Sequence, residues 1–136
     1  MKTIRTLLTA ILTFVAVSLS TQASAQTPNL TLEQKKEVIS MLKQQLPMEA
    51  GEGITWTAIN MDWSKYIIKL RFEIDPKGIG LTLKEAKYGF SSLSSNEVRE
   101  LVGKEFIDSM KMIGAKKVIL TLVFPDKTST SYEITC

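Results

Sequence analysis

Histidine is absent from the whole chain of 136 residues, and cysteine occurs once, as Cys136. Without histidine the chain has no Ser-His-Asp triad, no Cys-His nucleophile pair and no zinc site of the usual His/Cys kind. A single cysteine cannot form an intramolecular disulfide, so a domain built from this chain must depend on its hydrophobic core. These absences leave few routes to enzymatic chemistry.

The common catalytic and ligand-binding motifs are also missing. The sequence contains no P-loop, no G-x-G-x-x-G and no calcium loop of the D-x-D-x-D-G type, and its clustered serines form neither S-x-x-K nor G-x-S-x-G. Its clustered serines are explained by helix capping, and its clustered carboxylates by solvated helix surfaces and loops. We therefore predict no catalytic, cofactor-binding or metal-binding residues, and no cofactor.

Positive charge is modest. Lysine and arginine number 17 against 14 acidic residues, and two of the basic residues, Lys2 and Arg5, precede a long apolar run. If that segment is removed, 15 basic residues face 14 acidic ones and the net charge falls to about +1. A nearly neutral domain lacks the concentrated positive field that nucleic-acid binding requires, so nucleic acid is not expected as a partner.

The first 25 residues have the pattern of a cleavable signal peptide. Lys2 and Arg5 form a basic start, Leu7 to Leu19 is an apolar run, and Ala23-Ser24-Ala25 is a small-x-small cleavage site. The alternative is an uncleaved N-terminal anchor, but the run is shorter than the ~20 residues of a membrane span. No cysteine follows the site, so a lipid anchor is not expected. The sequence predicts a periplasmic or secreted protein with no stable membrane anchor after cleavage.

This division predicts three parts: the signal peptide at 1–25, a flexible leader at 26–30, and one domain at 31–136. Thr31 with Gln34 forms a capping box that begins the first helix of the domain, and Pro47 ends it. Residues 79–92 are the least regular stretch, although Thr82 with Glu85 indicates a short helix ending at Gly89.

A second long helix is predicted from Ser94 to Gly114. Ser94 and Glu97 form its capping box, and apolar residues then recur at helical spacing. Gly103 lies in the middle of this helix, where it costs ~1 kcal/mol relative to alanine. We interpret it as the mark of a close approach to the sheet.

Two β-hairpins are predicted from alternating apolar residues. The first joins Ile54–Met61 to Tyr66–Ile74 through a three-residue turn that opposes Trp56 to Leu70. The second joins residues 118–124 to 130–134 and opposes Leu122 to Tyr132. The fold predicted is a two-layer α+β domain of order helix–hairpin–helix–hairpin, with a four-stranded antiparallel sheet and two helices on one face.

Three short features of the chain occur together: Gln44-Gln45-Leu46-Pro47, Gly53-Ile54-Thr55 with its alternating hairpin, and a long helix ending Ile113-Gly114-Ala115 before a closing hairpin. In these features the chain resembles a group of small exported Gram-negative bacterial proteins of unknown function. The resemblance implies a periplasmic or outer-membrane location and no assigned activity. It transfers no functional residues.

The outer face of the predicted sheet is the candidate contact surface, because its aliphatic side chains have no helix to cover them. Trp63, at the tip of the first hairpin, is added as an exposed aromatic anchor. The surface comprises Ile59, Met61, Trp63, Ile67, Lys69, Arg71, Ile119 and Val123. Two alternatives stay open: residues 79–92 fold over this face, or the side chains are ordinary scattered apolar surface.

Cys136 has two interpretations. It is either a small, partly buried hydrophobic residue or a thiol that pairs between molecules. We interpret the protein as a non-enzymatic binding or accessory module acting through protein–protein contact, with a protein partner or a second copy bound by the sheet face, a sheet edge or Trp63. The alternative function is a small periplasmic hydrolase of unrecognised type, against which the missing histidine, metal set and nucleophile motif argue.

Overall fold

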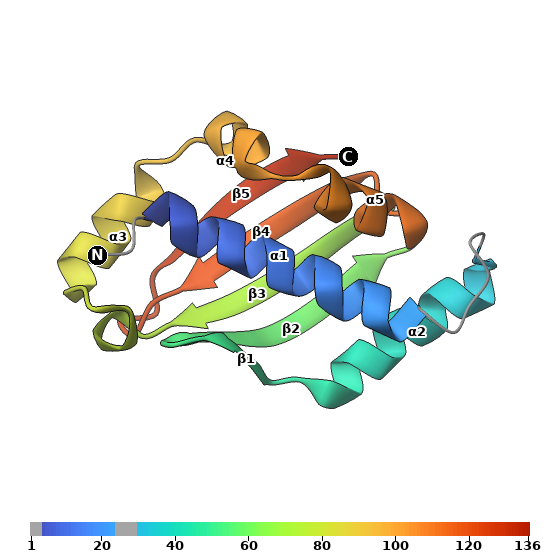
Figure 1. The fold of residues 1–136 in the computed structure, drawn as a ribbon, viewed down its shortest axis with the longest axis horizontal. Helices are drawn as coiled ribbons and strands as arrows, with labels where there is room; N and C mark the ends of the chain where they lie inside the picture. The colour runs from blue at the N-terminus through green and yellow to red at the C-terminus, as the bar shows by residue number, and fades with distance from the viewer. Residues whose placement is uncertain (1–3, 24–29) are drawn as a thin grey trace.

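A computed structural model of the protein describes residues 4–23 and 30–136 (Figure 1). The predicted cleavage site after Ala25 and most of the predicted leader 26–30 lie outside these residues. The elements, in chain order, are α1 (Ile4–Ala23), α2 (Leu32–Gln45), β1 (Met48–Gly51), β2 (Ile54–Asp62), β3 (Ile67–Ile74), the 3-10 helix η1 (Pro76–Ile79), α3 (Leu83–Ser91), α4 (Ser95–Leu101), α5 (Lys104–Met112), β4 (Lys117–Val123) and β5 (Ser129–Thr135).

The α+β class is confirmed, but the sheet differs from the predicted one. It has five strands in the order β1-β2-β3-β4-β5, and β3 pairs with β4 in parallel, so the sheet is mixed. Hairpins fix the direction of strands only within each hairpin. The helices between β3 and β4 carry the chain back across the sheet, and β4 therefore starts beside the start of β3.

The additional strand, β1, lies between Pro47 and the first predicted hairpin, where the sequence indicates no strand. Met48 pairs with Trp56 and Glu49 with Thr55. Gly53 supplies the positive φ of 72° that the turn into β2 needs, and a Cβ there would lie 2.6 Å from the backbone oxygen of Asp75. A four-residue strand containing a glycine gives too little alternation to be recognised in the sequence.

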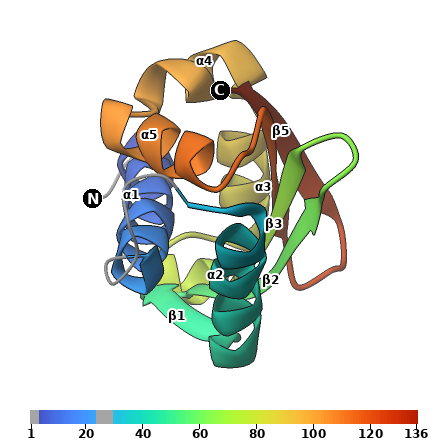
Figure 2. The ribbon, with the colours of Figure 1, turned by 90° about the vertical axis from the view of Figure 1, so that its right-hand side faces the viewer.

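All the helices that the structure describes cover one face of the sheet. Figure 1 shows α1 crossing this face between α2 and α5, and Figure 2 shows the sheet edge-on with the helices on one side. The core lies between these two layers. Its largest fully buried side chains include Trp56, Tyr132, Phe72 and Phe90.

Capping boxes begin the helices where the sequence predicts them. Thr31 and Gln34 begin α2, Ser94 begins α4, and Thr82 with Glu85 begins α3, each through reciprocal side-chain and backbone hydrogen bonds. The short predicted helix therefore exists, although it ends at Ser91 rather than Gly89.

The prediction of one continuous helix from Ser94 to Gly114 is wrong. Val102 is extended, with ψ of 122°, and Gly103 is the N-cap of a new helix, α5. No atom lies within 4 Å of the position that a Cβ on Gly103 would take, so this glycine does not mark a close approach to the sheet. The break lets α4 contact β5 while α5 contacts α1.

A β-bulge at Thr57 changes the first hairpin. Trp56 pairs with Phe72 and Ala58 with Arg71, so Thr57 is an extra residue without a partner of its own. The Trp56 indole N–H donates to the Ala58 carbonyl across the bulge at 2.9 Å. The predicted pairing of Trp56 with Leu70 is wrong because the turn was misplaced: Asp62 pairs with Ile67, so residues 63–66 form the loop instead of the predicted three-residue turn.

The second hairpin keeps its predicted apolar face, but the pairing register of its two strands differs from the predicted one by two residues. Leu120, rather than Leu122, pairs with Tyr132. The Phe124 amide donates to the Thr128 carbonyl at 2.9 Å, so the loop comprises residues 125–127, in which Lys127 has a positive φ of 71°. A shift of two residues preserves the side-chain alternation, so both apolar sets still face the core.

Helix α4 lies along the outer edge of β5. The Glu133 amide donates to the Ser95 hydroxyl at 3.0 Å, and the Arg99 guanidinium donates to the Thr135 carbonyl at 3.1 Å. These bonds use backbone groups of β5 that point away from β4.

Candidate contact surface on the open face of the sheet

The face of the sheet opposite the helices is formed by outward side chains of the central strands β3 and β4. In both strands buried residues alternate with residues that retain exposure. Ile67, Ile119 and Val123 are half-buried, and Lys69 and Arg71 are exposed. We define the open face by its central side chains, which are Ile67, Lys69, Arg71, Ile119, Thr121 and Val123.

Two of the predicted surface residues lie elsewhere. Ile59 and Met61 are only 3% and 5% exposed and belong to the core, so their assignment to the outer face is wrong. The bulge at Thr57 is the reason, because the extra residue reverses the facing of every later residue in β2. Ala58 and Asn60 take the outward positions instead.

Trp63 is not an exposed anchor. It is half-buried and packs against the core, while Tyr66 in the same loop is 39% exposed. The Lys116 ammonium lies 5.3 Å from the centroid of the Tyr66 ring, a cation–π distance. The aromatic group that this hairpin tip presents to solvent is therefore Tyr66.

Residues 79–92 do not cover the open face. They include α3, which lies on the helical side of the sheet (Figures 1 and 2). Phe90 anchors α3 there: its ring centroid lies 6.1 Å from that of Phe124, and its carbonyl accepts a hydrogen bond from the Tyr132 hydroxyl. Burial raises the pKa of Tyr132 to about 12, so the phenol keeps its donor proton.

Shallow depressions run along the open face. One of about 390 Å³ is lined by Lys69, Arg71, Thr121 and Val123, with Lys127 at its end. A second, of about 660 Å³, shares Arg71, Val123 and Lys127 with the first and continues past the strand ends. The first combines aliphatic and cationic lining, whereas the second also includes the Glu73 and Asp75 carboxylates.

The cations of this face are available to a partner. Within residues 4–23 and 30–136, the ion pairs are Arg5–Glu97, Lys87–Asp126 and Lys117–Glu133, and none includes Lys69, Arg71 or Lys127. The long stems of Lys69 and Arg71 can lie along the aliphatic centre while their charged ends stay in water. The open face thus has a small apolar centre with Lys69, Arg71 and Lys127 outside these ion pairs, and the exposed Glu73 lies at its β3 end.

The shifted pKa values of Cys136 and Asp62 have local causes. Burial raises the pKa of the half-buried Cys136 thiol, which disfavours the thiolate. A hydrogen bond from the Ser64 hydroxyl lowers the pKa of Asp62 and belongs to the β2–β3 loop. In the parts of the chain that the structure covers, no three His, Cys, Asp or Glu side chains gather as metal ligands would.

A second surface is occupied by α1, which lies across the helical layer. Its buried side chains recur every three or four residues, and its opposite side is exposed. The buried set is Leu7, Leu8, Ile11, Leu12, Val15, Ala16 and Leu19. None of the helices in the described parts of the chain combines the length and hydropathy that crossing a membrane requires.

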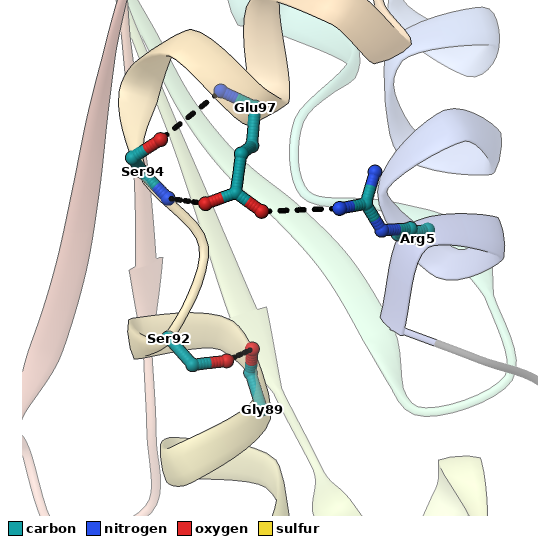
Figure 3. Close-up of polar contacts among 5 residues, drawn as sticks. All are labelled: Arg5, Gly89, Ser92, Ser94 and Glu97. Atoms are coloured by element: carbon teal, nitrogen blue, oxygen red, sulfur yellow. Dashed lines mark hydrogen bonds and ion pairs between the residues drawn. The ribbon is translucent and has the colours of Figure 1, made fainter.

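Polar and close contacts fix the position of α1. The Arg5 guanidinium lies 3.0 Å from the Glu97 carboxylate, which also accepts from the Ser94 amide in the α4 capping box (Figure 3). A Cβ on Gly89 of α3 would lie 2.6 Å from Cγ1 of Ile4. We call the surface beneath α1, with Trp56, Gly89 and Glu97 and the adjoining sides of α2 and α5, the α1-binding surface.

Comparison with family models, with curated proteins and with solved structures gives no match.

Sequence reasoning did not find the α1-binding surface, because it treated Leu7 to Leu19 as a uniform apolar run. A signal was present. Thr6, Thr9 and Thr13 fall on one side of the helix and are exposed. Polar residues spaced by three and four indicate a helix with two different sides.

Proposed function

We propose that the chain is exported, loses residues 1–25, and acts in the periplasm or outside the cell as a binding protein without enzymatic activity. Its partner is a protein surface with an apolar centre edged by carboxylates, which docks on the open face. The basic start, apolar run and small-x-small site support export, and so does the resemblance to small exported proteins.

The observation that carries this proposal is the open face itself. The central strands of a five-stranded sheet present half-buried aliphatic residues and unpaired cations on the side that no described helix covers. A partner with acidic residues around an apolar patch would complement both features. Docking on a sheet edge is less favoured, because Ser95 and Arg99 already bind outward backbone groups of β5.

The double variant Ile67→Lys/Ile119→Lys tests the open face. Both side chains are half-buried and lie outside the core, so the variant should fold while losing its partner. A photo-crosslinking residue at Thr121 should trap the partner in cells with the native face and fail with the double variant. Leu32→Lys/Met41→Lys, on exposed positions of α2, is the matched control and should leave crosslinking unchanged.

Circular dichroism and size-exclusion chromatography complete the test. If the double variant unfolds, Ile67 and Ile119 are core residues and the surface does not exist. If it folds and crosslinking at Thr121 persists, the open face is not the docking site. A crosslinked product with twice the mass of the chain identifies a second copy as the occupant and overturns the acidic partner.

A further inference from the structure

The α1-binding surface is shaped for a helix. The seven buried residues of α1 make one continuous side, whereas Thr6, Thr9 and Thr13 make the exposed side. From Ile4 to Leu19 a helix spans about 24 Å at 1.5 Å per residue. A surface that buries a helix by its repeat of three and four residues recognises the ridge of an amphipathic helix.

Gly89 is adapted to this occupant. It lies inside α3, where glycine is less favourable than alanine and where its φ is not positive. The backbone of α3 therefore does not require glycine. The Ile4 side chain lies against Gly89, and a Cβ there would come within 2.6 Å of Cγ1 of Ile4, so that this side chain would have to shift.

Glu97 gives the surface a direction. One carboxylate oxygen accepts from the Ser94 amide at 3.3 Å, and the other lies 3.0 Å from the Arg5 guanidinium (Figure 3). Arg5 is in the first turn of α1, so the acidic group marks the end where the N-terminus of the bound helix lies. Trp56 supplies an aromatic contact farther along, with its ring centroid 6.2 Å from that of Phe14.

We propose that processing vacates the α1-binding surface and that the exported domain uses it to bind an amphipathic α-helix of another polypeptide, with a basic residue in the first turn facing Glu97. This inference rests on the proposed function, because residues 1–25 must be removed before the surface is free. It goes beyond the open face, since it assigns a second site and a different recognition chemistry. Arg5 and Glu97 are specific to a polypeptide occupant with a basic residue, and a lipid chain would not use them.

The test begins with protein recovered after export from a bacterial host. Its intact mass reports whether residues 1–25 are gone. The probe is a synthetic peptide with the sequence of residues 4–19 and a solubilising lysine tail. Trp63→Phe in the protein leaves Trp56 as the one tryptophan, and the peptide contains none. A change in Trp56 fluorescence on titration then reports occupation of the surface.

Matched peptides distinguish recognition of one side of the helix from nonspecific hydrophobic binding. Leu8→Asp/Val15→Asp changes buried positions, and Thr9→Asp/Thr13→Asp changes exposed ones with the same added charge. We expect the first pair to weaken binding at least about tenfold and the second to leave it within about twofold. If both substituted peptides lost the same affinity, the surface would not recognise one side of a helix, and the inference would be overturned.

Protein variants test the two specific features. Gly89→Ala should raise the thermal stability of the processed domain, since alanine favours helix, and yet weaken peptide binding. Glu97→Gln keeps an acceptor for the Ser94 amide, and it should weaken the native peptide but not its Arg5→Gln version. If Gly89 had only a structural role, its substitution would not raise stability while weakening peptide binding. If Glu97 had only a structural role, its substitution would not distinguish the native peptide from the Arg5→Gln peptide.

The outcomes distinguish this inference from the proposed function. If the mass begins at Gln26 and the peptide fails to bind, the helix site is overturned while export stands. If the mass retains residues 1–25, the surface stays filled, and both processing and the helix site are overturned. Binding that is lost with the buried-side peptide and with Gly89→Ala supports the inference.

Discussion

The β2–β3 and β4–β5 hairpins are built from similar alternating sequences, but the alternation assigns side chains to the two faces of the sheet differently in each. In β4–β5 the alternation is uninterrupted, and Leu120, Leu122 and Tyr132 all face the core. In β2 the phase changes at Thr57, so Trp56 and Ile59 share a face although they are three residues apart. Side-chain alternation therefore assigns a face only as far as the next bulge.

Ile59→Lys should give the largest effect, and it tests directly whether the bulge places Ile59 on the core face of β2. Ile59 is 3% exposed, so the variant buries an ammonium without a partner and should cost more than about 4 kcal/mol. Ile119→Lys, on the half-buried side of β4, is the control and should cost under about 1 kcal/mol. Urea unfolding measures both, and equal losses would mean that the bulge does not set the facing of β2.

Deletion of Thr57 should have an intermediate effect. Without Thr57, Trp56, Ala58 and Ile59 follow one another in regular alternation with every apolar residue still inward. The loss is confined to the Trp56–Ala58 hydrogen bond and should be about 1–3 kcal/mol.

Deletion of Thr121 is the matched control in the regular hairpin. It would turn Leu122 and Phe124 outward and should cost about 3–6 kcal/mol, from about 1.5–3 kcal/mol for each buried side chain. Thermal or urea melts of the two deletions compare the hairpins directly. If deletion of Thr57 lowered the free energy of unfolding as much as deletion of Thr121, the assignment of a bulge at Thr57 would be wrong.

Asp126→Asn should have the smallest effect and tests the loop of the regular hairpin. The Lys87 ammonium, 2.6 Å away, and the Thr128 hydroxyl lower the pKa of Asp126 to about 2. Since its unfolded pKa is about 3.9, ionised Asp126 stabilises the fold above about pH 4 and loses this contribution as pH falls toward about 2. Urea melts should show the variant less stable at neutral pH and equal to the native protein below about pH 2. A difference that persists in strong acid would exclude ionisation as its cause.

Much of the helical layer could be predicted because capping is local. Thr31, Thr82 and Ser94 each satisfy backbone donors within the next turn, so the sequence signal and the structure coincide. The break at Gly103 could not be predicted in this way, because the apolar spacing continues through it. It depends on where α4 and α5 pack, which is a property of the assembled domain.

The candidate site was only partly predictable for the same reason. Ile67, Lys69, Arg71, Ile119 and Val123 belong to strands with regular alternation, and their positions follow from it. Ile59 and Met61 were misplaced because a bulge depends on pairing with another strand. The parallel pairing of β3 with β4 depends on helices that join distant parts of the chain.

The contacts of α4 with the margin of β5 have a consequence for solubility. The free margin of a sheet is a template on which further chains can add as strands, and such growth leads to fibrils. Ser95 and Arg99 occupy outward backbone groups of β5, and the opposite margin is a strand of only four residues, β1. An incoming strand would have to displace α4 or grow from a short, bulged template. The covered β5 margin and the short β1 margin therefore both disfavour edge-to-edge addition of strands, although the open face is aliphatic.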